Sequence, residues 1–348
     1  MPSLQRIESI FPAVRPARAP AGPGRPLCCV LIDAEEDFDW LRPVRGMPHD
    51  LECMRHLSEL QTILAPYGAV PTYLLTYPVM LDEGIVATLR DLLAQGVCRV
   101  GIQLHPWVTP PFTEAPEIRN SFFTNLGPEL EEAKLIELMQ LFRSCFGEDP
   151  KVFRAGRYGL SAHTPGLLEK YGFELDTSLA PCTSSADEQG PDFSADDYYP
   201  FWFGHSHRLL EVPLCRSIAG WGGEAAALVY RRLASVPNRG FLPSILPGLL
   251  ARSRCAERIT LSPEGNDPTA VGRLVQSLIG RGHRVLALSL HSSSLSVGQN
   301  PYVRNKEDLH RFYEQLAAIM DMLANRFNVR FVPSLELPAL LREDQKVI

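Results

Sequence analysis

The sequence predicts an α/β protein whose mostly parallel sheet closes, or nearly closes, into a barrel. Segments of β-prone apolar sequence alternate with segments of helical periodicity along most of the 348 residues, a pattern typical of parallel sheets covered by helices. Roughly seven or eight such strands can be counted, which favours a barrel. Polar residues also recur where the predicted strands end, and in a barrel those ends converge on one mouth.

The first predicted strand lies in Leu27–Trp40, LCCVLIDAEEDFDW. Its six apolar residues indicate a strand that is buried on both faces. Five carboxylates follow it: Asp33, Glu35, Glu36, Asp37 and Asp39. Because crowded carboxylates repel one another, either some of them are protonated or a cation lies among them. A solvated acidic loop is the alternative.

The remaining elements follow in order along one domain. Helices are expected over residues 51–64, capped by Asp50, and over 85–94, 129–146, 163–171, 269–281 and 306–327. Strands are expected over residues 69–79, 98–104, 151–159, 173–181, 259–265, 284–294 and 329–335.

Two segments do not fit the alternation of strands and helices. Residues 1–26 carry Pro, Arg and Ala without periodicity, which predicts a mobile or loosely packed arm. Residues 27–348 then form a single barrel domain, with an irregular insertion at about 182–257.

Composition narrows the class of protein. The net charge of -6 argues against a nucleic-acid partner, which requires a basic face. No apolar run approaches the roughly 20 residues of a membrane span, and the first residues lack the apolar core of a secretion signal. The eight cysteines include no CxxC pair and are interpreted as small buried hydrophobic residues in a reducing compartment. We therefore expect a cytoplasmic enzyme of undetermined oligomeric state.

Six polar residues lie at or just beyond the carboxyl ends of predicted strands. A lone histidine or aspartate in such a position is usually structural, but six in register predict an active site at the barrel mouth. They are Asp33, His105, Arg154, Asp176, Glu264 and His291.

The segments around these residues resemble a known family. LIDAEEDFDW, GIQLHPWVTPP, VFRAGRYG, FELDTSL and LSLHSSSLSVGQNPY are similar, in order and spacing, to the five active-site motifs of NodB-like polysaccharide deacetylases, carbohydrate esterase family 4. The resemblance extends over about residues 27–333 and is closest to a WalW-type branch. It implies a distorted (β/α)7 barrel and metal-assisted hydrolysis of an N-acetyl group on a sugar, releasing acetate.

The resemblance also implies roles for the first two motifs. Asp33 matches the general base. The acidic metal ligand is Glu35, Glu36 or Asp37, with Asp37 preferred, and His105 is a second ligand of a divalent metal such as Zn, Mn, Mg or Co. The family's second motif carries two histidines four residues apart, whereas this chain has only His105, and Gln103 lies where another histidine would be expected.

The later motifs match more closely. Arg154 matches the arginine that orients the catalytic carboxylate, Asp176 matches the fourth motif, and His291 matches the histidine that protonates the leaving amine. Two structural alternatives remain: an ion pair between Arg154 and Asp176, and a hydrogen bond from His291 to a neighbouring carbonyl.

Candidate substrate contacts lie beside these motifs. Trp107 and Tyr158 could stack on a sugar face, and Arg157 adds a cation. Glu264 is either a ligand or substrate contact or the cap of the following helix.

Two other functions remain open. Some NodB-like relatives act on cyclic ureides, so a metal-independent hydrolase of another non-peptide C–N bond is one alternative, which the missing histidine favours. A non-catalytic carbohydrate-binding relative is the other. For an enzyme in the cytoplasm, we expect the carbohydrate to be a precursor of lipopolysaccharide, capsule or a similar glycan.

Overall fold

The computed structural model describes residues 10–17, 24–37, 50–206, 208–234 and 241–343. Of the predicted acidic cluster, Asp39 lies outside these residues. So do residues 1–9 and 18–23 of the predicted arm.

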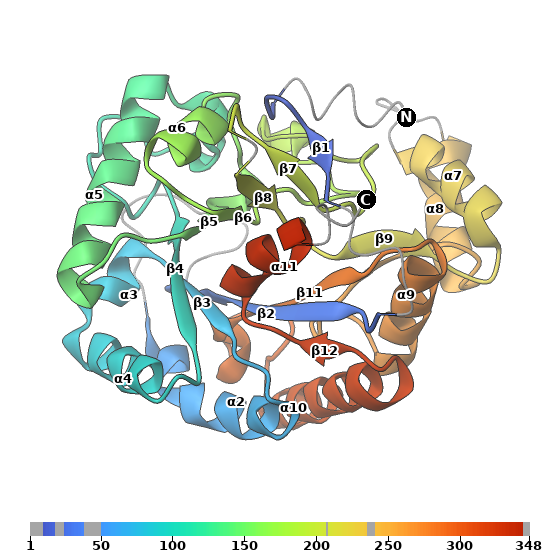
Figure 1. The fold of residues 1–348 in the computed structure, drawn as a ribbon. Helices are drawn as coiled ribbons and strands as arrows, with labels where there is room; N and C mark the ends of the chain where they lie inside the picture. The colour runs from blue at the N-terminus through green and yellow to red at the C-terminus, as the bar shows by residue number, and fades with distance from the viewer. Residues whose placement is uncertain (1–9, 18–23, 38–49, 207, 235–240, 344–348) are drawn as a thin grey trace.

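A mixed sheet occupies the centre of the molecule (Figure 1). Within the described residues its ten strands are β1 Arg15–Pro16, β2 Leu27–Ala34, β3 Thr72–Leu75, β4 Arg99–Leu104, β5 Val152–Ala155, β6 Leu175–Asp176, β7 Phe201–Phe203, β8 Leu209–Glu211, β11 Val285–His291 and β12 Arg330–Phe331. Their hydrogen-bonded order is β1, β7, β8, β6, β5, β4, β3, β2 and β11, and β12 also pairs with β2. The strands from β8 to β11 in this order run parallel.

Helices surround the sheet. They are α2 Leu57–Leu64, α3 Tyr77–Leu81, α4 Glu83–Ala94, α5 Pro128–Phe146, α6 Thr164–Lys170, α7 Gly223–Ala234, α8 Phe241–Arg252, α9 Pro268–Gly280, α10 Lys306–Asp321 and α11 Leu337–Glu343. In Figure 1, α2, α4, α5, α9 and α10 lie around the outside, and α11 lies across the middle of the ring of strands. Within the described residues, every helix is too short or too polar to cross a lipid bilayer.

β2 and β11 are the longest pair in the sheet and lie side by side (Figure 1). The apolar residues Cys28–Ile32 are buried, as expected for a strand covered on both faces. β11 pairs with β2 in parallel over seven residues, from Val285 beside Leu27 to His291 beside Asp33. This register brings two predicted site residues together at the carboxyl ends of neighbouring strands.

The wall between β8 and β11 is irregular. The backbone N–H of Leu261 donates to the carbonyl of Cys215 over 2.7 Å, and the N–H of Ser289 donates to the carbonyl of Leu261 over 3.1 Å. Single hydrogen bonds therefore close this side of the barrel in the described part of the chain. The predicted strand over 259–265 is instead β10, Glu257–Thr260, which pairs antiparallel with β9, Arg216–Ala219, in a separate small sheet.

Part of the predicted N-terminal arm packs on the barrel. β1 pairs antiparallel with β7, and the buried ring of Phe11 makes edge contacts with Phe201 and Phe203 at 5.1 and 4.9 Å between ring centroids. Residues 10–17 are therefore held by the sheet, in contrast to a mobile or loosely packed arm. The domain boundary itself stays a prediction.

The predicted insertion over 182–257 is more regular than the sequence indicated. It contains the barrel strand β8 and the two helices α7 and α8, and α7 and α8 contact each other. The Gly and Pro residues of this stretch lower its helix propensity, so its helices could not be recognised from the sequence. Tertiary packing stabilises them in spite of that low propensity. All eight cysteines of the chain are free thiols, and seven of them are buried.

Candidate active site

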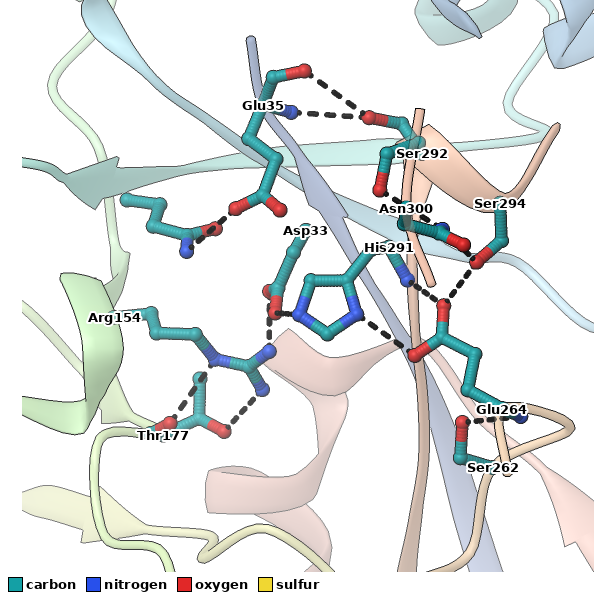
Figure 2. Close-up of polar contacts among 12 residues, drawn as sticks. Asp33, Glu35, Arg154, Thr177, Ser262, Glu264, His291, Ser292, Ser294 and Asn300 are labelled. Carbon is teal, nitrogen blue, oxygen red and sulfur yellow. Dashed lines mark hydrogen bonds and ion pairs between the residues drawn. The ribbon is translucent and has the colours of Figure 1, made fainter. Parts of the chain in front are cut away.

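A cavity of about 470 Å³ lies at the mouth of the barrel. Five of the six strand-end residues predicted to converge line it: Asp33, His105, Arg154, Glu264 and His291. Figure 2 shows four of them, with Asp33 and His291 at the ends of β2 and β11 and Arg154 approaching from β5. The sixth, Asp176, does not line the cavity.

His291 lies between two carboxylates (Figure 2). Its Nε2 is 3.4 Å from Oδ2 of Asp33, and its Nδ1 is 2.7 Å from Oε2 of Glu264. Glu264 is fixed in turn, because its Oε1 accepts hydrogen bonds from the backbone N–H of His291 at 2.8 Å and from the hydroxyl of Ser294 at 2.6 Å. The imidazole is therefore held at both ring nitrogens.

The pKa of His291 is raised to about 10. Burial is the largest single influence and favours the neutral ring, but the negative charges of Glu264, Glu35 and Asp33 outweigh it. The pKa of Glu264 is lowered, since the charge of His291 and the hydrogen bonds from His291 and Ser294 outweigh burial. The pair is therefore an imidazolium and a carboxylate at neutral pH.

Arg154 holds the second carboxylate. One of its terminal nitrogens donates to Oδ1 of Asp33, while its Nε and other terminal nitrogen donate to the carbonyl and hydroxyl of Thr177 at 3.1 and 2.9 Å. Burial alone would lower the pKa of Arg154, but the charge of Asp33 raises it. The guanidinium thus fixes the rotamer of Asp33 and leaves Oδ2 facing His291.

Asp176 is bonded elsewhere. It accepts a hydrogen bond from Ser178 and lies opposite Glu211 of β8 in the strand register. Burial raises the pKa of Asp176 to about 6 and that of Glu211 well above its ordinary value. The hydrogen bonds of Arg154 in the described structure go to Asp33 and Thr177, and not to Asp176, the partner considered as a structural alternative.

A second polar group surrounds His105. Its Nδ1 is 2.9 Å from Oε1 of Glu36, and its Nε2 is 3.0 Å from the amide nitrogen of Gln103 and 3.5 Å from Oε2 of Glu35. Burial raises the pKa of Glu35 well above its ordinary value. For Glu36, burial acts in the same direction, but the charge of His105 and hydrogen bonds together outweigh it and lower the pKa. The predicted ligand Asp37 does not line the cavity, and the two glutamates are the acidic residues that flank His105.

This group does not fit the divalent metal that the family resemblance implies. The contact of Nδ1 of His105 with Glu36 would leave Nε2 for a metal. Gln103, however, places its amide nitrogen 3.0 Å from that Nε2, and an amide nitrogen is not a metal donor. Across the described ranges, His, Cys, Asp and Glu side chains form no group of three or more that could hold a metal ion.

The candidate sugar contacts separate into two kinds. Trp107 is buried outside the cavity lining and stacks on His105, with ring centroids 4.2 Å apart. Tyr158 and Arg157 both line the cavity. Arg157 is bonded to Glu188 at 2.5 Å and to Ser121 at 2.8 Å. Both Arg157 and Tyr158 adopt positive φ angles, of 53° and 56°, a conformation that is costly for such side chains and is often found at functional sites.

Sequence reasoning missed two features of the site. The contact between Glu264 and His291 was not predicted. The alternative role of Glu264, as the cap of the following helix, belongs to Asp267, whose carboxylate accepts a hydrogen bond from the backbone N–H of Ala270 at 2.7 Å. Arg216 and Arg258 also line the cavity. Arg258 directly precedes the predicted strand over 259–265, whereas Arg216 lies within the predicted insertion, where no pattern in the sequence indicated it.

No protein-family model matches the chain, and no curated protein matches it. Among solved structures, a Pseudomonas aeruginosa PAO1 protein named as a probable polysaccharide deacetylase has 11% sequence identity and a TM-score of 0.50, covering 93% of this chain and 95% of that chain. A candidate polysaccharide deacetylase from Mycobacterium smegmatis has 14% identity and a TM-score of 0.49, covering 95% and 96%. PuuE allantoinase has 13% identity and a TM-score of 0.48, covering 93% of each chain.

The likeness to the Pseudomonas structure concerns the fold. The chain is an α/β protein with the distorted (β/α) barrel of the NodB or polysaccharide-deacetylase type, which confirms the predicted fold class. The WalW-type branch stays a prediction.

Proposed function

We propose that this protein is a hydrolase that removes the N-acetyl group of a sugar in a polysaccharide or in a glycan precursor, releasing acetate. The observation that carries the proposal is the row of Arg154, Asp33, His291 and Glu264 along the wall of one cavity. It places a carboxylate base beside a protonated imidazole acid, the two groups that amide hydrolysis requires.

Asp33 is the proposed general base. Arg154 occupies Oδ1, so Oδ2 is the oxygen that takes a proton from the attacking water. The water oxygen forms a bond with the acetyl carbon, and negative charge develops on the carbonyl oxygen. Arg154 uses three of its N–H groups in its contacts with Asp33 and Thr177, and a guanidinium has five. Its remaining donors are proposed to stabilise the oxyanion.

His291 is the proposed general acid. It donates the Nε2 proton to the departing amine as the C–N bond breaks, which yields acetate and the free amino sugar. Glu264 holds Nδ1 and stabilises the imidazolium before this transfer. The proton gained by Asp33 can return to His291 across the 3.4 Å between Oδ2 and Nε2, which restores both groups.

A second candidate is hydrolysis of another non-peptide C–N bond, as in a cyclic amide or ureide. The observation that favours it is that His105 lacks the second histidine of the resembling family, since Gly101 and Thr109 lie four residues from it and Gln103 contacts its Nε2. The same acid and base would serve this reaction. The two candidates differ in product, since only the first releases acetate from an N-acetyl sugar.

The test is acetate release from N-acetylated sugars by the wild type and two variants. We expect Asp33→Asn and His291→Ala to lose about 10²–10⁴-fold in kcat, the usual contribution of a general acid or base. The matched controls Asp91→Asn and His310→Ala change exposed helical residues and should keep wild-type rates. Ammonia or a ring-opened ureide as the product would favour the second candidate. If the wild type and both variants bind the carbohydrate equally well and none of them hydrolyses it, the protein is a non-catalytic relative.

A further inference from the structure

We propose that the sugar substrate carries a negatively charged oxyanion group, a phosphate or a carboxylate, and that Arg216 and Arg258 bind it. This inference rests on the proposed function and names the substrate class of the same cavity. Both arginines line that cavity together with Asp33 and His291, so one substrate can reach both ends.

The two arginines are neighbours on a small sheet. Arg216 of β9 lies opposite Thr260, and Arg258 of β10 lies opposite Ile218. Residues two apart on an antiparallel pair share a face, so Arg216 and Arg258 are diagonal neighbours on the same face. Two guanidinium groups therefore approach the cavity from adjacent strands, an arrangement suited to gripping one oxyanion.

Neither arginine is neutralised by the protein in the described structure. Arg216 donates to the hydroxyls of Thr260 at 2.8 Å and Thr183 at 2.5 Å, and Arg258 donates to the carbonyl of Cys182 at 3.2 Å. These acceptors are uncharged. They orient the guanidinium groups toward a shared site without cancelling their charge.

Arg216 is half-buried and Arg258 is exposed, and the other arginines near the cavity differ from both in having carboxylate partners. Arg154 pairs with Asp33, Arg157 pairs with Glu188, and Arg231 and Arg281 both pair with Asp197. Burial and then the charge of Arg258 lower the pKa of Arg216, which is the sign of two cations held together. An anion from the substrate that bound to both guanidinium groups would relieve this repulsion.

Tyr158 lies near both groups of cavity residues. The guanidinium of Arg154 is 5.6 Å from its ring centroid, and the charges of both Arg154 and Arg216 act on its hydroxyl. The hydroxyls of Thr183 and Ser185 line the same wall. A neutral polysaccharide would leave Arg216 and Arg258 unpaired in the complex.

The test measures binding without turnover, so it is independent of the hydrolytic step. Glucose 1-phosphate, glucuronate, glucose and inorganic phosphate are titrated into the full-length protein by calorimetry at low ionic strength. We expect at least one charged sugar to bind about tenfold or more tightly than glucose, as charge-assisted hydrogen bonds imply. Tighter binding of glucose 1-phosphate would identify a phosphate as the natural group, and tighter binding of glucuronate would identify a carboxylate.

The variants complete the test. Arg216→Gln combined with Arg258→Gln should abolish the preference for the charged sugar, whereas the control Arg330→Gln, at the opposite end of the barrel on β12, should keep it. Equal affinity for glucose and both charged sugars, or a preference that survives in the double variant, would overturn the inference. If the preference is present but no N-acetyl sugar is hydrolysed, the proposed function fails and the anion site stands.

Discussion

Glu264 sets the protonation state of His291. Its carboxylate is 2.7 Å from Nδ1 and is the largest of the influences that raise the pKa of His291 to about 10. Because the proposed general acid must be protonated, activity should persist through neutral pH and fall as the pH rises through about 10.

Replacing this carboxylate should move the alkaline limit. In Glu264→Gln the charge that favours the imidazolium is lost while burial, which favours the neutral ring, remains. We expect the alkaline limb of kcat/KM to shift to lower pH by roughly one unit or more, measured as a rate profile between pH 6 and 11. Glu83→Gln, at the exposed start of α4, is the control. An alkaline limb that stays in place would show that His291 is not the group that titrates.

The positions of Asp33 and His291 could be predicted because each ends a long apolar strand, and the ends of parallel strands meet. The partner of His291 could not be predicted in the same way. Glu264 reaches it from the loop between β10 and α9, and loop conformation is decided by tertiary contacts such as those with Ser294. Gln103 was visible as a departure from the family motif, but its contact with Glu35 at 3.2 Å was not.

At the scale of elements, the segment at 10–17 stabilises the edge of the sheet. Phe11 is fully buried against β7. Phe11→Ala should therefore lower the free energy of unfolding, measured by urea denaturation, by about 3 kcal/mol. This value is the lower end of the usual cost of removing a buried phenyl ring. Phe112→Ala, whose ring is 41% exposed, should cost less than about 1 kcal/mol.

Activity distinguishes this effect from damage to the site. Phe11 is not among the residues that line the cavity, so kcat should be unchanged well below the unfolding transition. A Phe11→Ala protein as stable as the wild type would mean that residues 10–17 do not pack on β7 in solution.

Long elements were predictable and short ones were not. The strand over 98–104 and the helix over 129–146 agree with β4 and α5 to within one residue, because periodicity extends over enough residues to be recognised. β1 has two residues, too few for any pattern. The antiparallel pairing of β10 with β9 also depends on tertiary context that apolar content does not encode.

At the scale of the molecule, the site is expected to work without a bound metal. The amide nitrogen of Gln103 occupies Nε2 of His105, the ring nitrogen that a metal would need because Nδ1 is bonded to Glu36. Prolonged dialysis against a chelator should therefore change neither the melting temperature nor the rate of acetate release. An ion stabilises a folded protein only by binding to it, so a chelator has no such stabilisation to remove here. Metal analysis of the protein before and after dialysis is the accompanying measurement. Loss of activity that is restored by Zn²⁺, Mn²⁺ or Co²⁺ would contradict this expectation.

The overall architecture was predictable from alternation alone, since strand and helix segments in turn allow few other arrangements. The substrate class was not. Arg216 lies in a stretch that the sequence indicated to be an irregular insertion, and Arg258 directly follows that stretch. Only the folded barrel brings them to the same cavity as Asp33.

The pairing of β2 with β11 has a consequence for how the protein is made. Glu35 and Ser292, which are bonded at the end of this pair, are 257 positions apart in the chain, so the ribosome must add most of the polypeptide before the two strands can meet. Contacts this distant in sequence form slowly. Until β11 emerges, β2 has an unpaired hydrophobic edge, which is where premature association between nascent chains would begin.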